Sequence, residues 1–429
     1  MPRRISPLLA LFLTVFLDLL AFGLVIPDIQ LRGESLGARG AILGLLIATF
    51  SIAQLAFAPG MGRLSDRIGR RPILLATTSL SALAFLAYAF ADNLPLMFLA
   101  RVLSGIASAN IGVAYAYVAD VTAAANRAKG MGVVGAAFGL GFILGPPLGS
   151  SLVSLDHARH IAAHPDLPLS AQYAAQPLVL GLSAVLLSAV NWAFVYWILP
   201  ESRKGREPER KLSTLATLRL GFSTKGLALL LALFFAFSFA FSNLESTYFR
   251  LSVNWFGLEQ YEGALILVVV GVVSAVMQGG VVRWAAPRFG EPALVRWSYL
   301  ALGPCLALIP FLKPWAPQIA VIIVTGIATG LAQPALGSLI SKSSPAALQG
   351  SVFGATQALG ALARILGPVA GNKLYELQPY APYLLAGAIM AIPALGAWWV
   401  KMPGDAPDHP VAEERYPQEG SPAKGTQPE

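Results

Sequence analysis

Apolar residues run through this chain in long stretches that are separated by short clusters of charge. Stretches of about 18 or more apolar residues are typical of helices that cross a membrane. Twelve such segments can be delimited, six on each side of a charged segment at 200–225. They cover residues 7–27, 41–61, 73–91, 94–119, 130–155, 177–199, 226–249, 262–284, 293–312, 316–341, 350–374 and 380–400.

This pattern predicts an all-α integral membrane protein with 12 transmembrane helices in two pseudo-symmetric six-helix bundles. The bundles comprise residues 1–199 and 226–400, and residues 200–225 form a charged cytoplasmic linker between them. Residues 401–429 are rich in proline, glycine and glutamate, which predicts a disordered cytoplasmic tail.

Two short motifs recur at nearly the same spacing, which indicates an internal duplication. LGPPLG at 144–149 returns as LGPVAG at 366–371, and DRIGR at 66–70 returns in a degraded form as PRFGE at 287–291. Duplicated six-helix units build transporters whose substrate site lies between the halves, near the middle of the bilayer.

Composition agrees with a membrane location and excludes a soluble protein. Of the 429 residues, 56% are hydrophobic and 12% are charged, whereas a soluble domain averages about a quarter charged residues. Although the net charge is +8, lysine and arginine fall in alternate connections and form no nucleic-acid-binding face. By the positive-inside rule, this placement predicts that both termini are cytoplasmic.

Charged side chains inside the apolar segments are candidates for function, because each costs about 2.5–3.5 kcal/mol at the centre of a membrane helix. Asp18 lies roughly 16 Å along the first helix, and its presence there favours a retained span over a signal peptide. Asp18 and Glu245 are the candidate proton carriers. Asp18 has an alternative role as a buried acid that locks helices together, and Glu245 as an interfacial residue that pairs with Arg250.

Two buried arginines, Arg101 and Arg364, need a carboxylate, carbonyl groups or an anionic substrate as partners. An alternative for Arg364 is to brace carbonyl groups of its own helix. The substrate-binding candidates are intramembrane polar residues, although single amides more often join helices. They are Gln54, Asn110, Gln333, Gln357 and Arg364. Four phenylalanines either form a wall for a lipophilic compound or face lipid, namely Phe16, Phe22, Phe50 and Phe57.

Four motifs resemble those of the major facilitator superfamily and its drug/proton antiporter branch, most closely the tetracycline/proton antiporter group. They are GRLSDRIGRRP at 62–72, RVLSGIASAN at 101–110, GAAFGLGFILGPPLG at 135–149 and FLDLLAFGLVIP at 16–27. The second half matches more loosely. Where tetracycline exporters of this group carry an aspartate in helices 3 and 9, ungapped alignment gives Ala84 and Leu302.

The resemblance implies a cytoplasmic gate in which Asp66 approaches the start of the eleventh helix near Gly350–Ser351, while Arg70 bridges to Asp120. It also implies that Arg101 tunes proton coupling. A glycine motif of the fifth helix is implied to seal that helix against the eighth; the alternative is that these glycines only allow ordinary packing of small residues. The gate residues are Gly62, Asp66, Arg67, Gly69, Arg70, Arg71 and Asp120. The fifth-helix motif comprises Gly135, Gly139, Gly145, Pro146 and Gly149.

These features predict an exporter of small lipophilic, drug-like compounds that is driven by protons and lies in a bacterial-type inner membrane. The alternatives are a carrier of a small metabolite, sugar or siderophore and, more remotely, a membrane enzyme. We expect a monomer with no cofactor, no metal and no nucleic-acid partner. A cluster of histidines in an external loop at 156–176 is a weak metal candidate, comprising His157, His160 and His164.

Overall fold

The computed structural model describes residues 6–122, 127–163, 176–202, 225–312, 315–344 and 349–399. Every regular element in these ranges is a helix. Ten helical segments of the described residues are long and apolar enough to cross a membrane, and α16 adds a shorter apolar stretch, Ala381–Leu395. The prediction of an all-helical, membrane-spanning fold is therefore confirmed.

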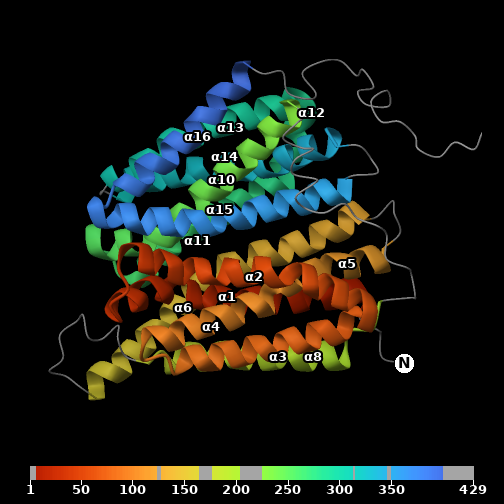
Figure 1. The fold of residues 1–429 in the computed structure, drawn as a ribbon. Helices are drawn as coiled ribbons and strands as arrows, with labels where there is room; N and C mark the ends of the chain where they lie inside the picture. Colours follow the sequence, from red (N-terminus) through yellow and green to blue (C-terminus); the bar gives the residue numbers. More distant parts are fainter. Residues whose placement is uncertain are drawn as a thin grey trace, which may run out of the picture.

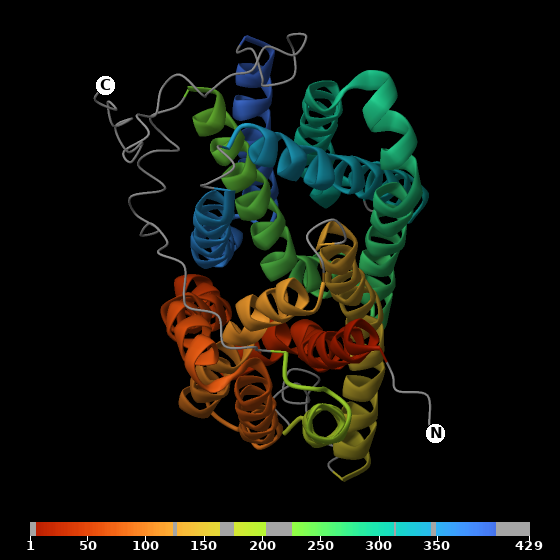
Figure 2. The same cartoon turned by 90° about the vertical axis from the view of Figure 1, so that its right-hand side faces the viewer.

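The helices before residue 200 occupy one half of the molecule and those after residue 225 the other (Figures 1 and 2). The first half contains α1 (Pro7–Ser35), α2 (Gly40–Ile68), α3 (Arg70–Ala89), α4 (Leu94–Ala107), η1 (Ser108–Asn110), α5 (Ile111–Val121), α6 (Arg127–Ala163) and α8 (Leu178–Trp197). The second contains α10 (Lys225–Arg250), η3 (Leu251–Trp255), α11 (Gln260–Val276), η4 (Met277–Val281), α12 (Val282–Phe289), α13 (Glu291–Leu308), η5 (Ile309–Phe311), α14 (Trp315–Lys342), α15 (Gln349–Leu377) and α16 (Ala381–Trp399).

Helices α1 and α4 begin with ordinary capping side chains, and several helices present apolar surfaces outward. Ser6 accepts a hydrogen bond from the Leu9 amide at 3.2 Å, and Asn93 accepts one from the Leu96 amide at 2.9 Å, so each satisfies an N–H group left free at a helix start. Large apolar side chains cover the outside of helices such as α11. Such continuous apolar surfaces suit contact with lipid better than contact with water.

Helix α1 is eight residues longer than predicted because two charged residues near its end, Asp28 and Arg32, neutralise each other. Asp28 and Arg32 lie one turn apart, their side chains are at most 1% exposed, and Arg32 Nε is 2.6 Å from Asp28 Oδ2. The Tyr88 hydroxyl of α3 donates a hydrogen bond to the same carboxylate oxygen at 2.7 Å. The prediction that the first helix ends at residue 27 was therefore wrong.

The motif at 62–72, expected to be a loop, lies almost entirely in helices. Only Gly69, with φ 102°, separates α2 from α3, and Gly290, with φ 79°, separates α12 from α13 at the corresponding point of the repeat. Both angles fall in the region that glycine adopts without steric cost. The predicted external loop at 156–176 also begins too early, because residues 156–163 belong to α6.

The duplicated LGPPLG and LGPVAG motifs make equivalent contacts in the two halves. In α6, a Cβ on Gly145 would lie 2.6 Å from the Gly23 Cα of α1. In α15, a Cβ on Gly367 would lie 3.0 Å from the Phe239 carbonyl oxygen of α10. In each half, therefore, a bare backbone lets one helix approach another closely, as expected of a duplicated unit.

Candidate functional site

A cavity of about 480 Å³ lies between the halves and is lined by side chains from both. The halves meet around it through contacts of α2 with α15, α6 with α11 and α1 with α10. All eight residues predicted for proton coupling or substrate binding line this cavity. They are Asp18, Gln54, Arg101, Asn110, Glu245, Gln333, Gln357 and Arg364.

The Asp18 carboxylate, partly buried on α1, faces hydroxyl and amide groups. Ser81 Oγ donates to Asp18 Oδ1 at 3.4 Å, and the Asn110 side chain also lies within hydrogen-bonding reach of Asp18. Asn110 Nδ2 donates to Thr77 Oγ1 at 3.0 Å, which fixes the amide against α3. Among the described residues, no basic side chain forms an ion pair with Asp18.

Aromatic rings, rather than a carboxylate, hold the Arg101 guanidinium. Its central carbon lies 4.9 Å from the centre of the Phe50 ring and 5.9 Å from that of Phe22. Nη2 donates to the Ile47 carbonyl at 3.2 Å, whereas Nε is buried and has no hydrogen-bond partner within the described structure. Cation–π contacts and a hydrogen bond to one carbonyl therefore set the orientation of the Arg101 guanidinium.

Glu245 projects from α10 into the cavity and interacts electrostatically with both Arg101 and Arg364. The alternative pairing of Glu245 with Arg250 is wrong. Gln30 Nε2 instead donates to the Glu245 main-chain carbonyl at 2.6 Å, which connects α1 to α10 across the two halves.

The remaining cavity candidates have unequal surroundings. Gln54 Nε2 donates to the Ser108 carbonyl at 3.0 Å, where η1 interrupts the helical hydrogen bonding between α4 and α5. Of the four phenylalanines, Phe22 and Phe50 line the cavity. Phe57 is exposed, and Phe16 stacks on Phe12 with ring centres 6.1 Å apart, so these two do not contribute to the lining.

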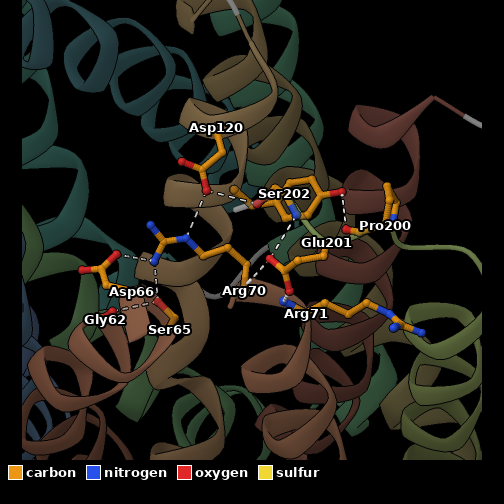
Figure 3. Close-up of polar contacts among 10 residues, drawn as sticks. Gly62, Ser65, Asp66, Arg70, Arg71, Asp120, Pro200, Glu201 and Ser202 are labelled. Carbon is orange, nitrogen blue, oxygen red and sulfur yellow. Dashed lines mark hydrogen bonds and ion pairs between the residues drawn. The ribbon is translucent and has the colours of Figure 1, made fainter. Parts of the chain in front are cut away.

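At the joint between α2 and α3, Arg70 binds two carboxylates (Figure 3). Its Nη1 is 2.6 Å from Asp66 Oδ1, and its Nε is 3.1 Å from Asp120 Oδ2. The expected contact of Arg70 with Asp120 is thus present. The expected approach of Asp66 to the helix start near Gly350–Ser351 lies outside the contacts that the structure describes, so it stays a prediction.

The sequence analysis missed Glu201, which caps the start of α3. Its Oε1 accepts from the Arg70 amide at 2.9 Å and its Oε2 from the Arg71 amide at 3.1 Å (Figure 3). A Cβ on Gly69 would lie 2.5 Å from Glu201 Oε2, so glycine also makes room for the carboxylate. One sequence feature pointed to such a cap. The residue before α3 is a glycine, which has no side chain to accept hydrogen bonds from the free N–H groups at the helix start, so the acceptor has to come from elsewhere in the chain.

The other gate residues make fewer or no close contacts. The Arg71 side chain reaches the main-chain carbonyls of Val195 and Tyr196 in α8. Arg67 is exposed, and a Cβ on Gly62 would meet no atom within 4 Å.

The degraded copy of this joint, in the second half, carries an ion pair with the opposite polarity. Glu291 replaces Arg70 at the first residue after the glycine, and its Oε1 lies 2.9 Å from Lys342 Nζ at the end of α14. Ser338 Oγ donates to the same oxygen at 2.7 Å. The reversed pair cannot be recognised from identical residues in the two motifs, because its charges are exchanged.

A second cluster of charges, here named the Arg250 cluster, joins the two halves at the end where α1 stops and α2 starts. It comprises Glu34 of α1, Arg250 of α10 and Glu376 of α15. Arg250 Nη2 is 2.8 Å from Glu34 Oε1 and 3.1 Å from Glu376 Oε1. The Gly40 amide donates to Glu376 Oε1 at 3.1 Å, which ties α2 to the same group.

The glycines of the fifth-helix motif do not form the expected seal against the eighth helix. Gly145 and Gly149 pack on α1, whereas a Cβ on Gly135 or Gly139 would meet no atom within 4 Å. Contact between α6 and α11 is made by Ile143, which lies within the same motif, because a Cβ on Gly271 of α11 would lie 2.6 Å from Ile143 Cγ1. Gly145 and Gly149 therefore serve close packing within their own half, whereas Ile143 contacts the other half.

A cavity that holds charged side chains between two similar helical halves, with charge clusters at both ends, is the layout of a secondary transporter. Residues 11–368 match the sequence model of the Major Facilitator Superfamily, and the chain belongs to this superfamily, whose members are transporters and not enzymes.

The chain is similar to several named transporters over most of its length. It is 28% identical to the tetracycline resistance protein, class B, of Escherichia coli, over 86% of this chain and 88% of the relative. It is 27% identical to multidrug resistance protein 2 of Bacillus subtilis, over 88% and 91%. The crystal structure of the human organic anion transporter MFSD10 superposes with a TM-score of 0.66 at 26% identity, covering 92% of this chain and all of the other.

Proposed function

We propose that this protein is a proton-coupled exporter of small lipophilic, drug-like compounds that works by alternating access. The observation that carries the proposal is the single cavity in which two carboxylates, Asp18 and Glu245, face an otherwise mainly apolar lining contributed by both halves. Acidic residues inside membrane proteins are typical of proton relays. The names of the tetracycline and multidrug resistance relatives agree with efflux.

The architecture that goes with this proposal has twelve spans in two six-helix bundles, residues 1–199 and 226–400. A linker at 200–225 and a tail at 401–429 lie in the cytoplasm, together with the Gly69 joint, because the positive-inside rule favours that side. The protein works as a monomer in a bacterial-type inner membrane.

In this orientation the Arg250 cluster closes the outer end of the cavity, since it links helices of both halves. The described ion pairs at the cytoplasmic end, by contrast, join residues within one half. Alternation requires that the Arg250 cluster break and that the cytoplasmic ends come together. Protonation of the cavity carboxylates favours one state and substrate the other, because a ligand shifts the equilibrium only by its difference in affinity.

Tetracycline itself is a poor fit to this cavity. Ala84 and Leu302, which stand where tetracycline exporters of the family carry acids, are 0% and 2% exposed and do not line it. The chain therefore lacks, at these two positions, the carboxylates that those exporters have.

The function is tested by expressing the protein in a bacterial host that lacks its own pumps and measuring susceptibility to a panel of lipophilic compounds. We expect reduced susceptibility to some members, together with proton movement when those compounds are added to inverted membrane vesicles. An unchanged panel and no proton movement would contradict the proposal.

Asp66→Asn is expected to reduce transport several-fold while the amount of protein in the membrane stays the same. The substitution removes the charge that pairs with Arg70 at 2.6 Å but keeps the shape of the side chain. Uptake into inverted vesicles measures the effect, and Asp92→Asn, at an exposed acid of the α3–α4 connection, serves as control. Normal uptake in Asp66→Asn would show that Asp66 has no role in the gate.

Arg250→Gln is expected to open the outer end and so raise access to the cavity several-fold. Glu34 and Glu376 then face each other without the cation that binds both. Access is measured from the outer face as the labelling rate of Gln54→Cys by an impermeant maleimide, with the native Cys305 replaced by serine. The control is Arg288→Gln, which removes an exposed cation on α12 and should leave the labelling rate unchanged. An unchanged labelling rate in Arg250→Gln would show that the Arg250 cluster has no role in closure.

A further inference from the structure

We propose that the cavity selects an amphipathic organic anion, whose carboxylate or sulfonate is held by Arg101 and Arg364 while its apolar body lies on phenylalanine side chains. The proposal rests on the transport function above and names the substrate class of the same cavity.

Arg101, which lines this cavity, has unused hydrogen-bonding capacity. A guanidinium carries five N–H donors, yet Arg101 is 5% exposed, Nε has no partner within the described structure, and Nη2 reaches one carbonyl. A buried donor without a partner is costly. The planar fork of a guanidinium matches the two oxygens of a carboxylate or sulfonate.

Arg364 approaches from the other half of the molecule. It lines the same cavity and, among the described residues, has no carboxylate within 4 Å. Gly360, one turn earlier on α15, lies beside the guanidinium, since a Cβ there would be in van der Waals contact with Arg364 Nη1 at 3.5 Å. An anion held by both arginines would therefore contact both halves at once.

The balance of charge around the two arginines favours an anion over a cation. Glu245 is the acid that interacts with both Arg101 and Arg364, so the three groups together carry one positive charge when Glu245 is ionised and two when it is protonated. Asp18 is engaged separately with Ser81. A cationic compound near Glu245 would be repelled by two guanidiniums, which supplies discrimination against that class.

The lining next to Arg101 suits a flat apolar body. The rings of Phe22 and Phe50 lie 4.6 Å apart between centres, and Phe142 of α6 meets Phe22 edge-on at 6.0 Å. Aromatic side chains with a few placed polar groups, in a cavity of about 480 Å³, are typical of sites for drug-sized ligands.

The test uses two dyes that share one ring system, the anion fluorescein and the cation tetramethylrhodamine methyl ester. Their binding to the purified full-length protein in detergent is measured by fluorescence anisotropy. We expect fluorescein to bind more tightly than the cation. Arg364→Gln should weaken fluorescein binding about 10- to 100-fold, the usual effect of losing a charged hydrogen bond, and Arg364→Lys should weaken it less.

Thermal unfolding checks that each variant is folded, and Arg288→Gln controls for loss of a cation outside the cavity. Tighter binding of the cationic dye, or fluorescein binding that is unchanged in both Arg364→Gln and Arg101→Gln, would overturn the proposal. Because the buried Arg101 variant can fail to fold, unchanged binding in a folded Arg364→Gln protein is sufficient to reject the two-arginine site.

Proton movement in vesicles separates this proposal from the proposed function. If the cationic dye causes proton movement and fluorescein does not, the result supports proton-coupled export and rejects the anion as substrate class. Fluorescein binding that depends on Arg364, without proton movement for either dye, would support the anion site and reject coupling to protons.

Discussion

Asp18→Asn is expected to abolish substrate-induced proton movement, with a reduction of at least about tenfold on the usual scale for losing a proton-transferring group. Asparagine has the size of aspartate and can still accept the hydrogen bond from Ser81, but it has no proton to release. Binding of substrate to the purified variant should persist. The measurement is the response of a pH-sensitive dye inside inverted vesicles when substrate is added.

The matched control is Asp92→Asn, since Asp92 is an exposed acid that does not line the cavity. Undiminished proton movement in Asp18→Asn would remove Asp18 from the mechanism and leave Glu245 as the cavity acid to examine. Loss of both binding and proton movement, in a protein that unfolds at a lower temperature, would instead favour the alternative in which Asp18 only locks helices together.

Gly149→Ala is expected to destabilise the folded protein strongly, whereas Gly139→Ala is not. A Cβ on Gly149 would collide with the Leu24 main chain of α1, lying 2.8 Å from its Cα, and a Cβ on Gly139 would meet nothing within 4 Å. Forcing atoms into a packed contact costs about 1–3 kcal/mol and occasionally more. The temperature midpoint of unfolding and the yield of monodisperse protein measure the difference.

Both substitutions add one methyl group to α6 and favour the helix equally, so helix propensity cannot explain a difference between them. Equal stability of the two variants would show that α1 and α6 are further apart than the structure has them. A loss in Gly139→Ala alone would indicate that this glycine, and not Gly149, faces a neighbouring helix.

The fold could be predicted because apolar stretches long enough to span a bilayer are rare outside membranes. Their ends were harder to place, because the sequence does not show whether a charge lies in a connection or is paired inside a helix. Asp28 and Arg32 neutralise each other within α1, and Tyr88 supplies a third partner from α3. Such pairing extends a helix through residues that look like its end.

The cavity residues could be predicted since a charge in a membrane segment is costly and needs a reason to be there. Arg101 and Glu245 were identified in this way, and the structure brings both to one cavity. The contacts that cap α3 and join the halves could not be found, because their partners are far apart in sequence. Glu201 lies 131 residues after Arg70, and Arg250 lies 216 after Glu34.

The cap on α3 bears on how the protein is made. Glu201 and the two carboxylates around Arg70 all precede α10 in the chain. The ribosome completes this set of partners before it starts on α10, and domains generally fold in the order of synthesis. Arg70 therefore has its counter-charges while the rest of the chain is still being translated, whereas Glu34 must wait for Arg250. Biosynthesis thus completes the contacts of the joint between α2 and α3 before the two halves can meet.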